Sequence, residues 1–147
     1  MNMTFPNEVL LPEVAAMLAA GSEVELRTKG SSMLPFIVGD RDSVRLKAMP
    51  AYAEGDAVLA EIAPGRFVLH RIVRIDGDCV TLKGDGNLVG TESCRLGDVK
   101  GKAVAVVRPG GRIRDLAGPR AIARARRWNA LPYFFRRYYL AIYRRLI

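Results

Sequence analysis

Histidine, cysteine and tryptophan are scarce in this chain of 147 residues, which has one histidine, two cysteines and one tryptophan. A zinc site needs several cysteine or histidine ligands at short spacings. Cys79 and Cys94 lack such a spacing, and His70 lies nine residues from the nearer of them, so neither a metal nor another cofactor is expected. Two free thiols in a reducing cytosol are the simplest interpretation, and a disulfide is the alternative for an exported protein.

Long apolar runs are also missing. No stretch of about 18 uninterrupted apolar residues occurs, so no transmembrane helix is predicted. The N-terminal segment has no basic region before its apolar pattern and carries Glu8 and Glu13 inside it, which is unlike a secretory signal peptide. The sequence therefore predicts a cytoplasmic protein.

Acidic residues are almost absent from the C-terminal segment. Residues 1–107 contain 12 lysines and arginines against 14 acids, whereas residues 108–147 contain 11 arginines and one acid. These two balances, −2 and +10, give the net charge of +8. The basicity belongs to one segment, and any partner chosen by charge is expected to bind there.

Three segments of different character make up the chain. Residues 1–20 have apolar positions at helical spacing over residues 7–20, which predicts a helix that ends at Gly21. Residues 21–108 predict a mainly β domain, antiparallel or mixed, with a small barrel as one option. Its predicted strands cover residues 23–28, 43–48, 56–62, 66–75, 79–83 and 103–108, separated by turns such as the hairpin sequence DGD.

Residues 109–147 predict an Arg-rich, amphipathic helical extension. Pro119 is well placed to open a helix to about residue 130, and Pro132 to open a second one that runs to the C-terminus. At about 100° per residue the second helix has an apolar side and a basic side. The apolar side holds Phe135, Tyr139, Ile142, Tyr143 and Leu146, and the basic side holds Arg136, Arg137, Arg144 and Arg145.

Three interpretations of this extension stay open. Its aromatic side packs on the domain and leaves the arginines in solvent, or the helix attaches the protein peripherally to the anionic inner face of a membrane. In the third, the helix docks on a partner protein or an acidic precursor. In the last two, Arg136, Arg137, Arg144 and Arg145 make the contacts. Nucleic acid is disfavoured because the β domain is slightly acidic and the aromatics belong to an apolar stripe.

Residues 29–40 read KGSSMLPFIVGD and place two serines before an apolar run. Serine is a weak nucleophile until a base activates it, and His70 in FVLHRIVRI is the one histidine available. Its apolar neighbours favour the neutral imidazole that a general base needs. The DGD hairpin would bring Asp85 of KGDGN close to the imidazole, where a carboxylate could orient it. The alternatives are a structural histidine and a simple Gly-Asp-Gly-Asn turn.

The segments GSSMLP, GDRDSVRL, GDAVLA, HRIV and LKGDGN follow one another in this order over residues 21–107. Together they resemble the S24/S26 serine peptidases, and within them the histidine-containing branch of type I signal peptidases found in archaea and the endoplasmic reticulum. The resemblance implies a signal peptidase/LexA-like β domain with Ser32 as nucleophile, His70 as general base and Asp85 as the orienting carboxylate. It places Ser31, Met33 and Pro35 around the oxyanion site and substrate cleft.

The sequence departs from that family pattern in three places. The family has a transmembrane anchor, and none is predicted here. The histidine branch has a second acidic pair soon after its GD-N motif, whereas LVGTES offers only Glu92, to which no role is assigned. Gly30 stands where the bacterial branch often has a serine that assists the oxyanion, so backbone N–H groups such as that of Ser32 would take this part.

The resemblance implies a serine endopeptidase that cleaves a peptide or protein precursor, with a membrane surface as one place of action. Substrates of this family bind as extended strands, with small residues favoured before the scissile bond. A non-catalytic module that keeps the fold and binds a peptide or partner is the alternative. Self-cleavage at Ala20–Gly21, as in repressor relatives of the superfamily, is the third and least favoured hypothesis.

Overall fold

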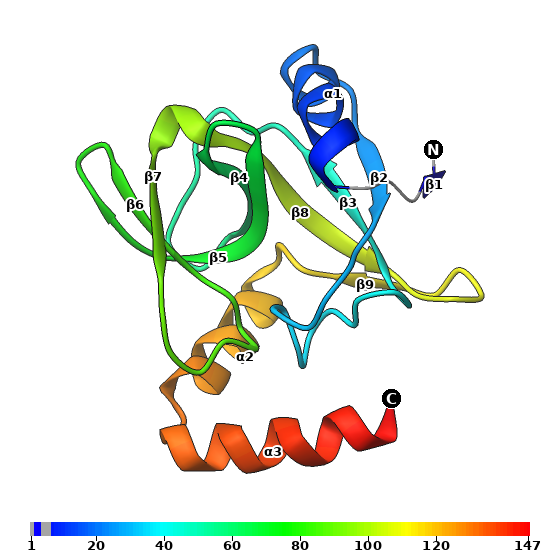
Figure 1. Cartoon of the computed structure of the whole chain (residues 1–147), viewed down its shortest axis with the longest axis vertical. Helices are drawn as coiled ribbons and strands as arrows, with labels where there is room; N and C mark the ends of the chain where they lie inside the picture. Colours follow the sequence, from blue (N-terminus) through cyan, green and yellow to red (C-terminus); the bar gives the residue numbers. More distant parts are fainter. Residues whose placement is uncertain (1, 4–6) are drawn as a thin grey trace.

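An open, largely antiparallel sheet lies at the centre of the protein, with one helix between its first two strands in the chain and two helices after its last strand (Figure 1). The computed structural model describes residues 2–3 and 7–147. Helices α1 (Asn7–Ala19), α2 (Pro119–Ala130) and α3 (Tyr133–Leu146) make the architecture mixed α/β, whereas the sequence predicted a mainly β fold. Across these described residues, no helix combines the length and apolar composition that a membrane span requires.

The sheet follows an open path through the described part of the chain. In spatial order its strands are β1 (Asn2–Met3), β2 (Val24–Arg27), β3 (Ser43–Lys47), β8 (Val99–Val107), β4 (Ala57–Ala63), β5 (Arg66–Asp76), β6 (Cys79–Lys83) and β7 (Glu92–Arg95). Strand β9 (Ile113–Asp115) pairs with β8, and the 3₁₀ helix η1 (Leu96–Asp98) joins β7 to β8. Because β1 and β7 end the path and do not pair with each other, the described strands do not close into the small barrel considered above.

Most strand predictions are confirmed. The six predicted segments correspond to β2, β3, β4, β5, β6 and β8, and the DGD turn forms a hairpin in which Asp76 pairs with Cys79. The sequence analysis missed β1, β7 and β9. Strands β7 and β9 are short and mostly polar, so they have no apolar alternation that a pattern search could detect.

Helix α1 and one face of the sheet form the main apolar core. Leu11, Val14 and Leu18 of α1 share a buried cluster with strand residues that include Val44 and Leu46 of β3. A second buried cluster joins β4, β5, β6 and β8. The two clusters lie on either side of β4 and β5, which explains why these two central strands are rich in apolar residues.

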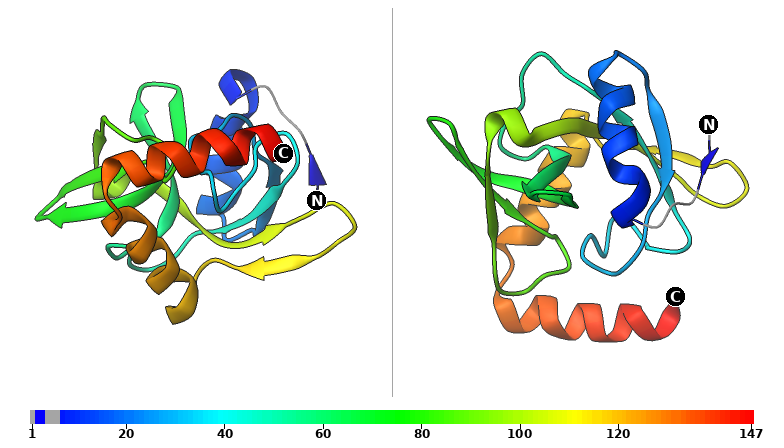
Figure 2. Two further views of the ribbon diagram at one scale, coloured as in Figure 1. Left: turned by 90° about the horizontal axis from the view of Figure 1, so that it is seen from below. Right: turned by 45° about the horizontal axis from the view of Figure 1, so that its top comes forward.

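The Arg-rich extension is packed on the β domain. Pro119 occupies the first turn of α2, as predicted, and α3 begins after a two-residue break. Trp128 of α2 and Leu140 of α3 form a third buried cluster with Leu34 and Val38 from the loop between β2 and β3. Seen from below, α3 runs across this loop (Figure 2). The extension therefore covers part of the β domain.

Helix α3 meets the domain with little of the aromatic side that one of the three interpretations placed there, although Tyr143 of that side does pack on the third cluster. Its buried residues are Leu140 and Arg136, so the expectation that Arg136 belongs to the exposed contact residues is wrong. Arg136 Nε donates to the Leu131 carbonyl oxygen at 3.2 Å. Most of the predicted packing side is exposed: Phe135 (49%), Tyr139 (44%), Ile142 (61%) and Leu146 (79%). The periodicity identified the apolar stripe, but it could not tell which side of the helix faces the domain.

The packing of α3 can be tested with one substitution at two positions of the helix. Leu140 is 2% exposed and Leu146 is 79% exposed. We expect Leu140→Ala to lower the free energy of unfolding by about 2–5 kcal/mol, because it removes buried contacts and leaves a cavity. We expect Leu146→Ala to change it by less than about 0.5 kcal/mol. Urea unfolding measures both, and equal effects would show that α3 is not docked as described.

Candidate active site

Ser32 lies in a loop of residues 28–42 that connects β2 to β3, called the serine loop below. The base of the loop is closed by Thr28, whose backbone N–H and hydroxyl donate to the Asp42 carbonyl oxygen at 3.0 and 2.9 Å. The buried Asp42 carboxylate accepts the Val38 N–H at 2.9 Å and Arg41 Nε at 2.8 Å. These bonds join the two ends of the loop and restrict the positions that its serine can take.

The Gly-Asp-Gly-Asn turn packs directly on the serine loop. Gly86 N–H donates to the Ser32 carbonyl oxygen at 2.8 Å. A Cβ atom at Gly84 would overlap the Ser32 carbonyl oxygen, and a Cβ atom at Gly86 would overlap that of Ser31. Both glycines are therefore required for this close approach of two backbones. The turn holds the nucleophile candidate in place, and this is a structural function that the sequence analysis did not foresee.

A cavity of about 200 Å³ opens between the serine loop and strands β2, β3, β4 and β5. Ser32 and His70 both line it, together with Gly30 and the buried Met33. The rest of its lining is mainly apolar and includes Leu26, Ile37, Val44, Leu46, Leu59, Phe67 and Leu69. The structure thus brings the predicted nucleophile and the predicted base to one apolar cavity.

Two residues predicted at the cleft lie elsewhere. Ser31 is exposed and is not part of the lining of this cavity. Pro35 lines a different cavity, next to α2 and α3, so the expectation that it borders the substrate cleft is wrong. The turn after Met33 is the cause, because Phe36 and Ile37 both donate their N–H groups to the Met33 carbonyl oxygen and the chain reverses there. Of the three expected cleft residues, Met33 alone lines the cavity.

Glu92 makes the closest polar contact of the histidine. Glu92 Oε2 lies 2.6 Å from His70 Nδ1. Because a carboxylate oxygen accepts and does not donate, this contact places an imidazole proton on Nδ1, and in the neutral ring Nε2 is then the acceptor. The His70 side chain is 6% exposed and that of Glu92 is 30% exposed. The imidazole is therefore buried, with its carboxylate partner at the edge of the solvent.

The strand register explains how Glu92 reaches a histidine 22 residues earlier. Strand β6 pairs with β5 only as far as Arg71, so His70 has no partner on that strand. On β7, Glu92 lies opposite Leu82, which in turn lies opposite Ile72. Residues 70 and 72 share one face of β5, since side chains alternate along a strand. Glu92 can therefore reach His70 past the end of β6.

Asp85 does not contact His70, contrary to the expectation from the sequence. It forms a bidentate ion pair with Arg71, with Arg71 Nε 2.9 Å from Oδ1 and Nη2 2.7 Å from Oδ2. Both side chains are buried. Successive residues of a strand point to opposite faces, so a carboxylate that meets Arg71 lies on the wrong side of β5 to orient His70.

The ion pair joins parts of the chain that are distant in sequence. Arg71 Nη1 donates to the Gly55 carbonyl oxygen at 2.7 Å. From α2, Asn129 Nδ2 donates to Asp85 Oδ1 at 3.0 Å and Trp128 Nε1 donates to the Asp85 carbonyl oxygen at 2.8 Å. Asp85 is therefore the point at which the C-terminal extension is hydrogen-bonded to the turn that supports the serine loop.

Ser32 and His70 line one cavity without a direct bond. Among the described residues, His70 has a hydrogen bond with Glu92 and none with Ser32. Catalytic hydrogen bonds are often long in a free enzyme and shorten when substrate binds. Among the described residues, no group accepts a hydrogen bond from the backbone N–H of Ser32. This donor is therefore available to an oxyanion.

The cysteines offer no competing nucleophile in this cavity. Both are free thiols, and neither lines the cavity of Ser32 and His70. Burial raises the pKa of the Cys94 thiol to about 11, so at neutral pH it is almost entirely protonated and a poor nucleophile. Within the described ranges, no cluster of three or more histidine, cysteine or acidic side chains has the arrangement of a metal site.

Glu92 is the site residue that sequence reasoning passed over. The only signal was its position soon after the GD-N motif, where the family resemblance calls for an acid. The chain matches no protein-family model and no curated protein. The functional assignment below therefore rests on the motifs in the sequence and on the geometry of this cavity.

The structural role of Asp85 can be separated from catalysis by measuring stability. We expect Asp85→Asn to lower the free energy of unfolding by about 3–5 kcal/mol, because it leaves the buried Arg71 guanidinium without its counter-charge. Asp76→Asn is the matched control: its ion pair with Arg74 is 3.6 Å long, both side chains are at least 70% exposed, and we expect a change below about 1 kcal/mol. Chemical denaturation measures the free energy of unfolding of both variants. If Asp85→Asn leaves this free energy unchanged, the proposed role of the ion pair is wrong.

Proposed function

We propose that the protein is a serine endopeptidase of signal-peptidase-like fold that cleaves a peptide or protein precursor. Ser32 is the nucleophile, His70 the general base and Glu92 the residue that orients His70. The observation that carries the proposal is the 2.6 Å contact of Glu92 with His70 Nδ1 at the cavity that Ser32 also lines. This chain of carboxylate, imidazole and hydroxyl groups is the arrangement that serine hydrolysis needs.

The geometry suggests the following course of reaction. With Nδ1–H donated to Glu92, His70 Nε2 takes the Ser32 hydroxyl proton as Oγ attacks the peptide carbonyl carbon. Glu92 stabilises the imidazolium, which then gives its proton to the leaving amine as the peptide bond breaks. The backbone N–H of Ser32 supports the oxyanion. Water, deprotonated by His70, then hydrolyses the acyl ester and restores Ser32.

The surroundings of the cavity support an extended peptide as substrate. Strand β6 pairs with β5 from Arg71 onward, so residues 66–70 have no described strand along the edge that faces away from β4. An extended segment could pair with this edge and reach the cavity lined by Phe67 and Leu69. Because the lining is mainly aliphatic and aromatic, we expect an uncharged apolar side chain to enter the cavity.

A non-catalytic peptide-binding module is the second candidate. It is favoured by the missing hydrogen bond between Ser32 and His70 among the described residues. Such a module would use the same cavity and the same strand edge, but it would release its peptide intact. The two functions differ in a single observable, which is whether new peptide termini appear.

The two serines give a matched test of the nucleophile. We expect the wild-type protein and Ser31→Ala to cleave members of a peptide library, and Ser32→Ala to cleave none, because Ser32 alone lines the cavity with His70. Mass spectrometry of newly formed amino termini measures cleavage. If Ser32→Ala produces the same termini as the wild type, Ser32 is not the nucleophile. If no variant cleaves but all bind the library, the binding module is the better description.

Glu92 can be tested by an isosteric change. We expect Glu92→Gln to lower kcat by about 10²- to 10⁴-fold, because an amide neither holds the Nδ1–H tautomer nor stabilises the imidazolium. Glu61→Gln serves as control, since Glu61 Oε2 accepts the Gly65 N–H in an exposed turn. Cleavage rates of a peptide identified in the library experiment measure both. An unchanged rate in Glu92→Gln would remove Glu92 from the mechanism.

A further inference from the structure

A second cavity, of about 330 Å³, lies between the serine loop, β8, β9 and the C-terminal helices. Arg71 lines this cavity, whereas its chain neighbour His70 lines the cavity of Ser32. Arg108, Arg114 and Arg124 contribute to the lining, as does Tyr139 of α3. None of these groups has a part in the proposed peptidase mechanism.

The cavity has an excess of positive charge. Arg71 is neutralised by Asp85, and Asp115, the acid in the lining, accepts the N–H groups of the next turn with both of its oxygens. In the described part of the chain, Arg108, Arg114 and Arg124 have no carboxylate partner. Three free guanidinium groups against one engaged carboxylate leave a site suited to an anion.

One donor in this cavity lacks the bond that a buried donor normally has. Arg108 Nε is buried, and among the described residues no acceptor lies within hydrogen-bonding distance. Buried donors in folded proteins are almost always satisfied, so an unpaired guanidinium N–H suggests a missing acceptor. The planar guanidinium group matches the oxygens of a phosphate in particular.

The exposed stripe of α3 borders the same cavity. This α3 stripe comprises Phe135, Tyr138, Tyr139, Ile142 and Leu146, each at least 44% exposed. Tyr139 belongs both to the stripe and to the cavity lining, and Arg137, Arg144 and Arg145 are exposed on the same helix. Aromatic and aliphatic side chains combined with arginines are typical of helices that lie in the interface of an anionic bilayer.

We propose that α3 docks on an anionic phospholipid bilayer, with the phosphate of one lipid headgroup in the arginine-lined cavity. Free phosphate could fill the cavity but would leave the α3 stripe in water. A nucleic acid would not use Ile142 and Leu146. The balance of +10 in residues 108–147 supplies the complementary charge. This proposal goes beyond the peptidase and does not depend on it.

Docking would also bring the serine loop close to the bilayer. Leu34 and Val38 of the serine loop pack on Leu140, on the domain side of α3. The loop is thus separated from the docked surface by the thickness of one helix. A precursor held at the membrane surface would then be presented near the cavity of Ser32.

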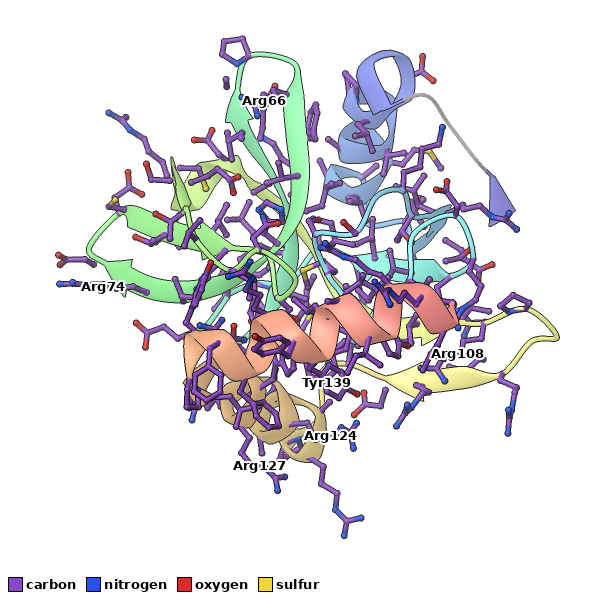
Figure 3. The ribbon with its side chains drawn as sticks, turned by 60° about the horizontal axis from the view of Figure 1, so that its bottom comes forward. Arg66, Arg74, Arg108, Arg124, Arg127 and Tyr139 are labelled. Carbon is purple, nitrogen blue, oxygen red and sulfur yellow. The ribbon has the colours of Figure 1, made fainter. Side chains whose placement is uncertain are left out.

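Vesicle binding by the full chain tests the proposal. We expect co-sedimentation with vesicles of phosphatidylcholine and phosphatidylglycerol at 3:1, and little with phosphatidylcholine alone. Arg124→Gln and Arg114→Gln should each weaken binding by about fivefold, the effect of one charge near an anionic surface. Arg74→Gln and Arg66→Gln are the controls and should bind as the wild type, because these exposed arginines lie away from α2 and α3 (Figure 3).

The apolar contribution has its own matched pair. We expect Ile142→Ser to weaken binding to the mixed vesicles at least fivefold, because Ile142 would lose its burial in the interface. Val73→Ser removes an exposed apolar residue on β5, 40% exposed, and should have no effect. Circular dichroism checks that each variant is folded. We expect all of them to fold, because the substituted side chains are exposed.

Several results would overturn the proposal. Equal binding to neutral and anionic vesicles, or equal weakening by Arg74→Gln and Arg124→Gln, would show that this surface does not select an anionic bilayer. Tighter binding of duplex DNA or RNA than of vesicles would assign the surface to nucleic acid. Binding of inorganic phosphate that needs Arg124, without vesicle binding, would assign the cavity to a soluble anion. Ser32→Ala should bind vesicles normally even if the peptidase proposal fails.

Discussion

The buried ion pair of Arg71 and Asp85 connects four parts of the fold that are distant in sequence. It connects strand β5, the Gly55 carbonyl oxygen before β4, the Gly-Asp-Gly-Asn turn and, through Trp128 and Asn129, helix α2. A buried charge without its partner costs several kcal/mol, so these parts stabilise one another's native positions. The C-terminal extension is therefore part of the folded domain.

Two neighbouring residues of β5 make different kinds of contact. Arg71 binds Asp85, to which the extension is hydrogen-bonded, while His70 binds Glu92 and lines the cavity of Ser32. In the Gly-Asp-Gly-Asn turn, Asp85 binds Arg71 while Gly86 binds the Ser32 backbone. This turn is therefore hydrogen-bonded both to α2 and to the serine loop.

The two proposals place two different activities at two separate cavities. The apolar cavity and the open strand edge suit a peptide in an extended conformation, while the arginine-lined cavity and the α3 stripe suit a charged interface. The serine loop lies between them and contacts both, because Met33 faces the first cavity and Pro35 faces the second. Cleavage of a precursor at a membrane surface would use both cavities at once.

Local sequence patterns were sufficient to predict most of the helices and strands, and the family resemblance was sufficient to propose Ser32 and His70. Apolar alternation, turn chemistry and Pro119 are local signals, so the main strands and all three helices could be predicted from them. The choice of Glu92 over Asp85 depended on the pairing of three strands, which decides the face of β5 that each carboxylate reaches. The burial of Arg136 and the exposure of the α3 stripe likewise depended on the docking of Leu140 against the serine loop. Both are contacts between distant residues, and tertiary packing alone selects among the faces that a local pattern allows.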